Sequence, residues 1–184
     1  MENPLLELQE YENLLEALKK AKGPLQAAGT LESQKVHLMH ELGEDGGFPW
    51  KLVVTYDEHT AKEIYDDFRS FTKQVWLYPA KDLLFYAADI HGNLMTRQRI
   101  CVLRHLMEDE GGVVVTTVDG LMGHLMPLAF LKQNAVTVEC GQVIDLDEWK
   151  ERLTELGYER MGQVDGMGQF SIRGGIIDIF PLTE

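Results

Sequence analysis

The chain has 184 residues, of which 45% are hydrophobic and 26% charged, a composition that suits one or two folded domains and excludes a disordered chain. Its formal net charge is -13, whereas a surface that binds duplex nucleic acid is normally rich in lysine and arginine. The overall field therefore repels phosphates and argues against a duplex-binding protein, although a local basic patch would be compatible with it.

The N-terminus and the cysteines indicate a cytoplasmic protein. The opening residues lack the basic region and apolar stretch of a signal peptide, and no apolar run approaches the length of a membrane span. Cys101 falls in a helical pattern and Cys140 ends a strand-like run, so both fit small buried or half-buried residues better than a disulfide. We expect a cytoplasmic protein without a membrane partner.

Residues 1–126 alternate helices with short apolar strands, which predicts an α/β domain with a parallel sheet. Strands are expected over residues 25–28, 52–55, 75–78 and 113–117. Helices are expected over residues 4–22, 34–42 and 96–110, and from a capping box of Thr55 and Glu58 to about residue 71. Residues 43–47 are expected to form a surface turn, and residues 79–95 mostly a loop.

The pattern changes at Pro127, and residues 127–184 predict the first part of an α+β domain. A strand is expected over residues 135–140, followed by a helix that Asp145 caps and Gly157 ends. Antiparallel strands are then expected over residues 158–164, 169–172 and 176–180. Because only four residues follow Phe180 and no element closes the domain, we expect the chain to be a fragment of a longer protein.

The loop before the second predicted helix occupies the position of a phosphate-binding loop, between a strand and a helix. The pattern G-x-x-x-x-G-K-[ST] is required there, and Gly29 and Lys35 agree with it. Gln34 replaces the second glycine, and Val36 replaces the hydroxyl residue that would hold Mg²⁺. Whether this is a degenerate nucleotide site or a loop that never bound nucleotide, we expect no ATPase and no cofactor.

No other group of residues predicts catalytic or metal chemistry. His37, His40 and Glu41 share a helix but do not form H-E-x-x-H, and the sequence offers no third ligand nearby. A surface pair of histidines is the better interpretation. No Ser/His/Asp or Cys/His set can be assigned, so we predict no catalytic residue and no metal site.

The C-terminal stretch predicts a hairpin with an arginine beside its bend. Two apolar strand-like runs flank Gly174 and Gly175, and Arg173 stands just before these glycines, where a partner can approach its guanidinium closely. When this stretch is taken alone, a hairpin bend with a solvated arginine is the better interpretation.

Three separate stretches resemble one known module. LDEWKERLTELGYERMGQVDGMGQFSIRGGIIDIFP, LYPAKDLLFYAADIHGNLMTRQR and GVVVTTVDGLM resemble, in the same order, the N-terminal module of the bacterial transcription-repair coupling factors (Mfd). That module is similar to the nucleotide-excision-repair protein UvrB, but it has lost its ATPase motifs. The resemblance covers the chain from about Gly29 onward and favours a degenerate nucleotide loop in a UvrB-like domain.

The resemblance implies a non-catalytic module that recruits UvrA, the damage-recognition subunit. Arg173 matches the arginine of the UvrB motif that contacts UvrA. The resemblance therefore implies a partner-binding set of Arg173, Gly174, Gly175 and Phe170. RNA polymerase and DNA are implied as partners of the whole protein, an ATP-driven translocase, through parts outside these residues. The alternatives are UvrB itself and a free-standing nucleotide-binding protein. The first requires a longer insertion than residues 79–95 supply, and Gln34 and Val36 disfavour the second.

Overall fold

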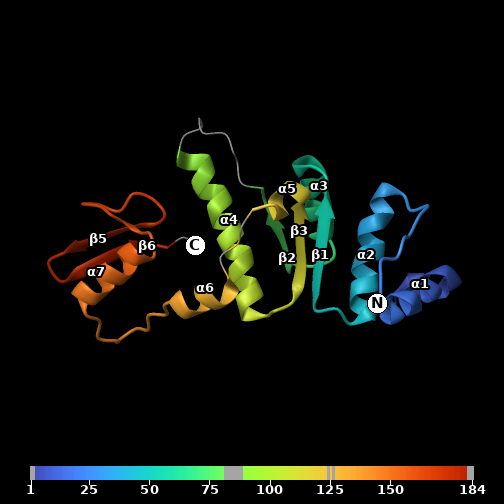
Figure 1. Cartoon of the computed structure of the whole chain (residues 1–184), viewed down its shortest axis with the longest axis horizontal. Coiled ribbons are helices and arrows are strands. Elements are labelled where there is room, and N and C mark those ends of the chain that lie inside the picture. Colours follow the sequence, from blue (N-terminus) through green and yellow to red (C-terminus); the bar gives the residue numbers. More distant parts are fainter. Residues whose placement is uncertain (1–2, 81–88, 124, 126, 182–184) are drawn as a thin grey trace. The chain divides into compact units, whose positions relative to one another are not determined.

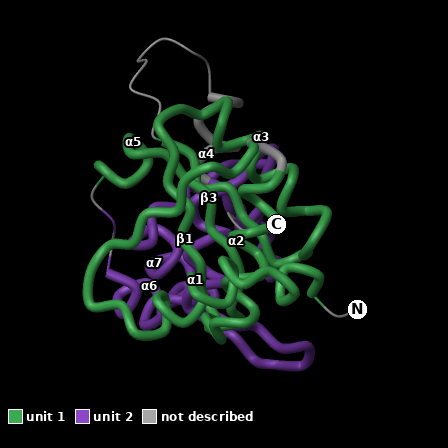
Figure 2. Tube along the Cα trace, turned by 90° about the vertical axis from the view of Figure 1, so that its right-hand side faces the viewer, with its two compact units in different colours: residues 1–81, 108–123 green, residues 82–107, 124–184 purple. Residues whose placement is uncertain are grey.

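The computed structural model describes residues 3–80, 89–123, 125 and 127–181, which form two compact units (Figures 1 and 2). Unit 1 comprises residues 1–81 and 108–123, and unit 2 comprises residues 82–107 and 124–184. The first helices are η1 (Pro4–Glu7, a 3-10 helix), α1 (Gln9–Lys20), α2 (Glu32–Gly46), α3 (Glu58–Phe68) and α4 (Asp89–Glu108). The remaining helices are α5 (Val118–Leu121), α6 (Leu128–Asn134) and α7 (Leu146–Glu155). None of the described helices is long and apolar enough to cross a membrane.

Unit 1 contains a parallel sheet, as the alternation of helices and strands predicts. Its strands are β1 (Trp50–Thr55), β2 (Val75–Tyr78) and β3 (Gly112–Thr117), in the order β1-β3-β2. Every residue of the central strand β3 is buried, which explains its continuous run of valine and threonine. The predicted α/β class is therefore confirmed.

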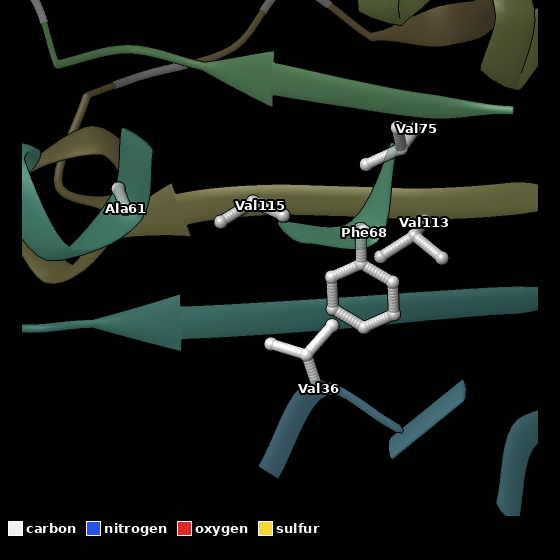
Figure 3. Close-up of a cluster of buried hydrophobic side chains, with 6 residues drawn as sticks. All are labelled: Val36, Ala61, Phe68, Val75, Val113 and Val115. Atoms are coloured by element: carbon white, nitrogen blue, oxygen red, sulfur yellow. The ribbon is translucent and has the colours of Figure 1, made fainter. Parts of the chain in front are cut away.

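The core of unit 1 lies between one face of this sheet and helices α2 and α3 (Figure 3). Phe68 of α3 and Val36 of α2 point toward Val113 and Val115 of β3, and all four side chains are buried. Gly112 opens β3 because a side chain there would overlap the Trp76 ring and lie 2.6 Å from the Gln74 carbonyl oxygen. A residue with a Cβ at this position would force the strands apart.

Unit 2 carries a smaller sheet in the order β4-β5-β6. Its strands are β4 (Glu159–Arg160), β5 (Gln169–Arg173) and β6 (Ile176–Phe180). Strands β5 and β6 are antiparallel, as expected, but β4 pairs parallel with β5 and is only two residues long. The predicted all-antiparallel arrangement and the long strand over residues 158–164 are therefore wrong.

Several predicted element boundaries in unit 1 are also wrong. Residues 25–28 form no strand, and the glycine-rich residues 43–46 continue α2 instead of forming a surface turn. Asp57, not Thr55, caps α3, because its carboxylate accepts the N–H of Thr60 at 2.8 Å, and the helix ends at Phe68. The N-terminal helix is interrupted at Leu8, between η1 and α1.

In unit 2, residues 135–140 form no strand, whereas Asp145 caps α7 as predicted, accepting the N–H of Asp147 at 2.8 Å. The expected loop over residues 79–95 lies partly outside the described residues, which resume at 89. Residues 89–95 belong to α4, so this part of the expected loop is wrong.

Candidate protein-docking site

The β5–β6 hairpin presents Arg173 at its tip. Arg173 lies opposite Ile176 in the strand register, so Gly174 and Gly175 alone form the turn. Gly174 has a φ of 62°, a backbone conformation that a side chain would strain. The Gly-Gly pair therefore permits a tight turn and leaves no side chain to cover the adjacent guanidinium.

Arg173 is exposed but already has a partner within the hairpin. Its Nη2 donates to Oδ2 of Asp178 at 2.5 Å, and the two side chains are 62% and 41% exposed. Asp178 lies opposite Ser171 in the register, one diagonal step from Arg173 on the same face of the sheet. Arg173 is thus not simply solvated, and its pair with Asp178 is compatible with a merely structural role as well as with docking.

The face of the hairpin that carries Arg173 also carries exposed apolar side chains. The register places Ile176, Asp178 and Phe180 of β6 on the same face as Arg173, because side chains alternate along each strand. Ile176 is 65% exposed and Phe180 is 38% exposed. We call the four residues Arg173, Ile176, Asp178 and Phe180 the hairpin face; they combine a cation, an anion and apolar surface.

Phe170 does not belong to this face, although the sequence groups it with the partner-binding residues. Its register position places it on the opposite side of β5, and its side chain is 0% exposed. Phe170 is buried on the opposite face of the hairpin and offers no surface for a direct contact with a partner. The sequence could have indicated this, since Phe170 and Arg173 are an odd number of residues apart on one strand.

Hydrogen bonds around the base of the hairpin fix its position in unit 2. Oε1 of Gln169 accepts the backbone N–H groups of Asp165 and Gly166 at 3.0 and 2.9 Å. The buried hydroxyl of Ser171 donates to the carbonyl oxygen of Gly162 at 3.1 Å. The loop before β5 is thereby held against the strand, which leaves the tip as the exposed part.

The predicted phosphate loop does not have the geometry of one. Since residues 25–28 form no strand, the strand that must precede such a loop is missing, and α2 begins at Glu32. Gln34 lies in the first turn of α2, where its Oε1 accepts the N–H of Leu31 at 3.4 Å. The amide thus caps its own helix at the position where a phosphate would need free N–H groups.

Val36 and Lys35 point in different directions from this helix start. Val36 is 2% exposed and packs in the core of unit 1, so the position of the expected Mg²⁺ ligand faces hydrophobic side chains. Lys35 is exposed. Gly29 lies in an irregular segment. The residues beside it, 27, 28 and 30, line a groove of about 470 Å³ together with mostly apolar residues between Leu5 and Leu14 and from α2. Neither the backbone nor the lining fits a nucleotide phosphate.

The two histidines of α2 pack on one aromatic ring. The rings of His37 and His40 lie 5.4 and 5.2 Å from that of Phe71, measured between centroids. His37 Nε2 is also 3.6 Å from a carboxylate oxygen of Glu41, one turn along the helix. These contacts account for the pair without a metal ion.

The sequence missed a polar junction at the carboxyl ends of the parallel strands. Oε1 of Glu58 accepts the N–H of Ala80 at 3.0 Å and the hydroxyl of Thr117 at 3.2 Å. Thr117 in turn accepts the N–H of Gly120, and Thr116 donates to the carbonyl oxygen of Tyr78. Parallel sheets usually bind ligands at this edge. Here Glu58 of the chain itself joins the segment that follows β2 to the last residue of β3.

Residues 136–184 match the model of the UvrB interaction domain family. The chain is also similar to transcription-repair-coupling factors, with 34% identity over 135 residues to that of Bacillus subtilis (strain 168). Identities are 30% and 32% over 133 residues to those of Staphylococcus haemolyticus (strain JCSC1435) and Staphylococcus epidermidis (strain ATCC 35984).

These matches cover 71–72% of this chain but only 11–12% of the length of the relatives. The range matched by the family model includes the whole of the β5–β6 hairpin and α7. The chain is therefore similar to part of the bacterial transcription-repair-coupling factors and, over its C-terminal residues, to the UvrB interaction domain family.

Proposed function

We propose that this chain is a non-catalytic docking module that recruits UvrA for nucleotide excision repair. The observation that carries the proposal is the exposed Arg173 at the tip of a hairpin within the UvrB interaction domain. A guanidinium can form a bidentate pair with a carboxylate of a partner, and arginine is over-represented among the residues that dominate binding energy. Gly174 and Gly175 leave the approach to it open.

The proposal of a non-catalytic role rests on the start of α2. Gln34 caps the helix, Val36 is buried in the core, and no strand precedes the loop at Gly29. These features support a chain that neither binds nor hydrolyses ATP. No cofactor is part of the proposed activity.

For the whole protein we propose the coupling activity that the name of the relatives describes. RNA polymerase and DNA would be bound, and ATP used for translocation, by parts that these residues do not include, since the chain spans about an eighth of the relatives' length. The module would act in the bacterial cytoplasm, where both transcription and DNA repair take place. The matches favour this family over the alternative of a UvrB-type helicase.

Replacing Arg173 by alanine tests the proposal. We expect Arg173→Ala to weaken binding to purified UvrA by at least tenfold, because truncating one member of a buried charged pair costs about 2–5 kcal/mol at an interface. Arg173→Lys should restore the affinity only in part, since lysine lacks the planar fork. Titration calorimetry gives the affinity, and thermal unfolding of the same variants gives their stability.

The two measurements separate docking from a merely structural role. The Arg173–Asp178 pair is exposed, so its loss should change the melting temperature little. If the affinity for UvrA stays at the wild-type level, or falls only together with the melting temperature, Arg173 stabilises the hairpin and is not a contact.

A further inference from the structure

Asp178 binds only one edge of the Arg173 guanidinium. The single hydrogen bond runs from Nη2 to Oδ2, and no other side chain among the described residues bonds to this group. Nε and Nη1 of the same planar group therefore remain available as donors. The pair lies across the hairpin, on the exposed face shared with Ile176 and Phe180.

An arginine that is already held in place binds a partner at a lower entropic cost. A free arginine side chain has many rotamers and must give them up when it docks. Arg173 is attached to a neighbouring strand through Asp178, so its direction is restricted before a partner arrives. Because the bond is monodentate, this restriction does not consume the donors that a second carboxylate needs.

We infer that Asp178 is a positioning residue, which holds Arg173 so that its remaining nitrogens meet a carboxylate of the docking partner. The inference rests on the proposed function and specifies the chemistry of the partner surface. That surface presents an acidic side chain to Arg173 and apolar atoms to Ile176 and Phe180, which flank the pair on the hairpin face. A basic partner surface would meet Arg173 with repulsion.

Asp178→Asn tests this role, because asparagine keeps the shape of the side chain and removes its charge. We expect this variant to bind UvrA about threefold to tenfold more weakly than the wild type, through loss of pre-organisation. In an Arg173→Ala background the same substitution should have no further effect, since there is no arginine left to position. The melting temperature should change by less than about 2 °C.

Glu44→Gln is the matched control. Glu44 accepts a hydrogen bond from Lys51 at 2.6 Å in unit 1, so this variant also loses one partly exposed ion pair, but away from the hairpin. Its affinity for UvrA should equal that of the wild type. A general effect of net charge on binding would weaken or strengthen both variants alike.

Two results would overturn the inference. Binding of Asp178→Asn at wild-type strength or tighter would show that Asp178 is irrelevant or competes with the partner for Arg173. A loss that persists in the Arg173→Ala background would show that Asp178 contacts UvrA directly. Absence of binding by the wild-type chain would instead refute the proposed function itself, so the two failures are distinguishable.

Discussion

Val36 has the chemistry that the sequence predicts, but it does not have the location that the phosphate-loop motif implies. The sequence places it at a Mg²⁺-binding position, and the lack of an oxygen there is real. In the structure the Val36 side chain has different surroundings, because it is buried between α2 and strand β3 of the sheet. A motif position predicts geometry only if the flanking strand and helix exist, and here the strand does not.

Restoring the hydroxyl at this position should therefore damage the fold without creating a nucleotide site. We expect Val36→Thr to lower the free energy of unfolding by about 1–2 kcal/mol, since a hydroxyl is buried among apolar side chains. Urea denaturation measures this loss. Calorimetric titration of the same variant with Mg-ATP should show no binding.

Val118→Thr is the control for this prediction, because Val118 is 54% exposed in the same unit. Its free energy of unfolding should stay within about 0.5 kcal/mol of the wild-type value. Micromolar ATP binding by Val36→Thr, or an unchanged stability, would contradict the account of α2.

At the level of elements, a buried tyrosine attaches the N-terminal helices to α2. Tyr11 of α1 is 3% exposed, and its hydroxyl donates to Oδ2 of Asp45 at 2.7 Å. Asn3, which caps η1, donates to the same carboxylate oxygen at 2.7 Å. Burial, and then the hydrogen bond to the Asp45 carboxylate, raise the pKa of Tyr11 above its ordinary value of 10.0.

This raised pKa makes stability depend on pH in the alkaline range. The folded state holds the phenol proton more tightly than the unfolded state, so the contribution is complete below about pH 10 and is lost as the pH rises further. Tyr11→Phe should lose about 1.5 kcal/mol of unfolding free energy at pH 7. Above pH 10, its stability should fall less steeply than that of the wild type.

Urea unfolding at pH 7 and at several values above pH 10 measures both effects. Tyr56→Phe is the matched control, since Tyr56 is 81% exposed and its removal should leave the pH dependence unchanged. Parallel alkaline curves for the wild type and Tyr11→Phe would show that the Tyr11–Asp45 bond does not attach these helices.

The sequence predicts best those elements whose packing and strand pairing in the fold favour the same secondary structure as their own residues do. The β-branched run of β3 is buried on both faces, and Ile176–Phe180 pairs fully with β5. Residues 25–28 and 135–140 are also short and largely apolar, but no strand within the described part of the chain pairs with them. Local pattern cannot reveal whether a partner strand exists, so such runs are ambiguous.

The helix errors have a different origin. Residues 43–46 contain two glycines and favour a turn, yet they extend α2, where a side chain at Gly43 would overlap Lys51. Tertiary packing against β1 overrides the local preference here. At the start of α3 the residues Thr55 and Asp57 both suit a cap, and only the position where β1 ends decides between them.

At the scale of the whole molecule, the sequence predicts the parallel sheet and the hairpin with Arg173. It does not predict the order or the register in which the strands pair. The parallel order β1-β3-β2 needs long-range pairing, which periodicity does not contain. The partner of Arg173 and the burial of Phe170 likewise depend on the register of β5 with β6. The family match and the exposed hairpin face together favour a module that functions by binding a protein partner.

Hydrogen–deuterium exchange of the wild-type chain, with and without purified UvrA, tests this central claim most directly. We predict slower exchange over residues 169–180 when UvrA is added, because the partner covers the hairpin face and excludes water from its backbone. Exchange over α2 and α3, including the region around Gln34 and Val36, should stay unchanged. No protection at a saturating concentration of UvrA, or protection confined to residues outside 169–180, would contradict the assignment of this hairpin as the docking site.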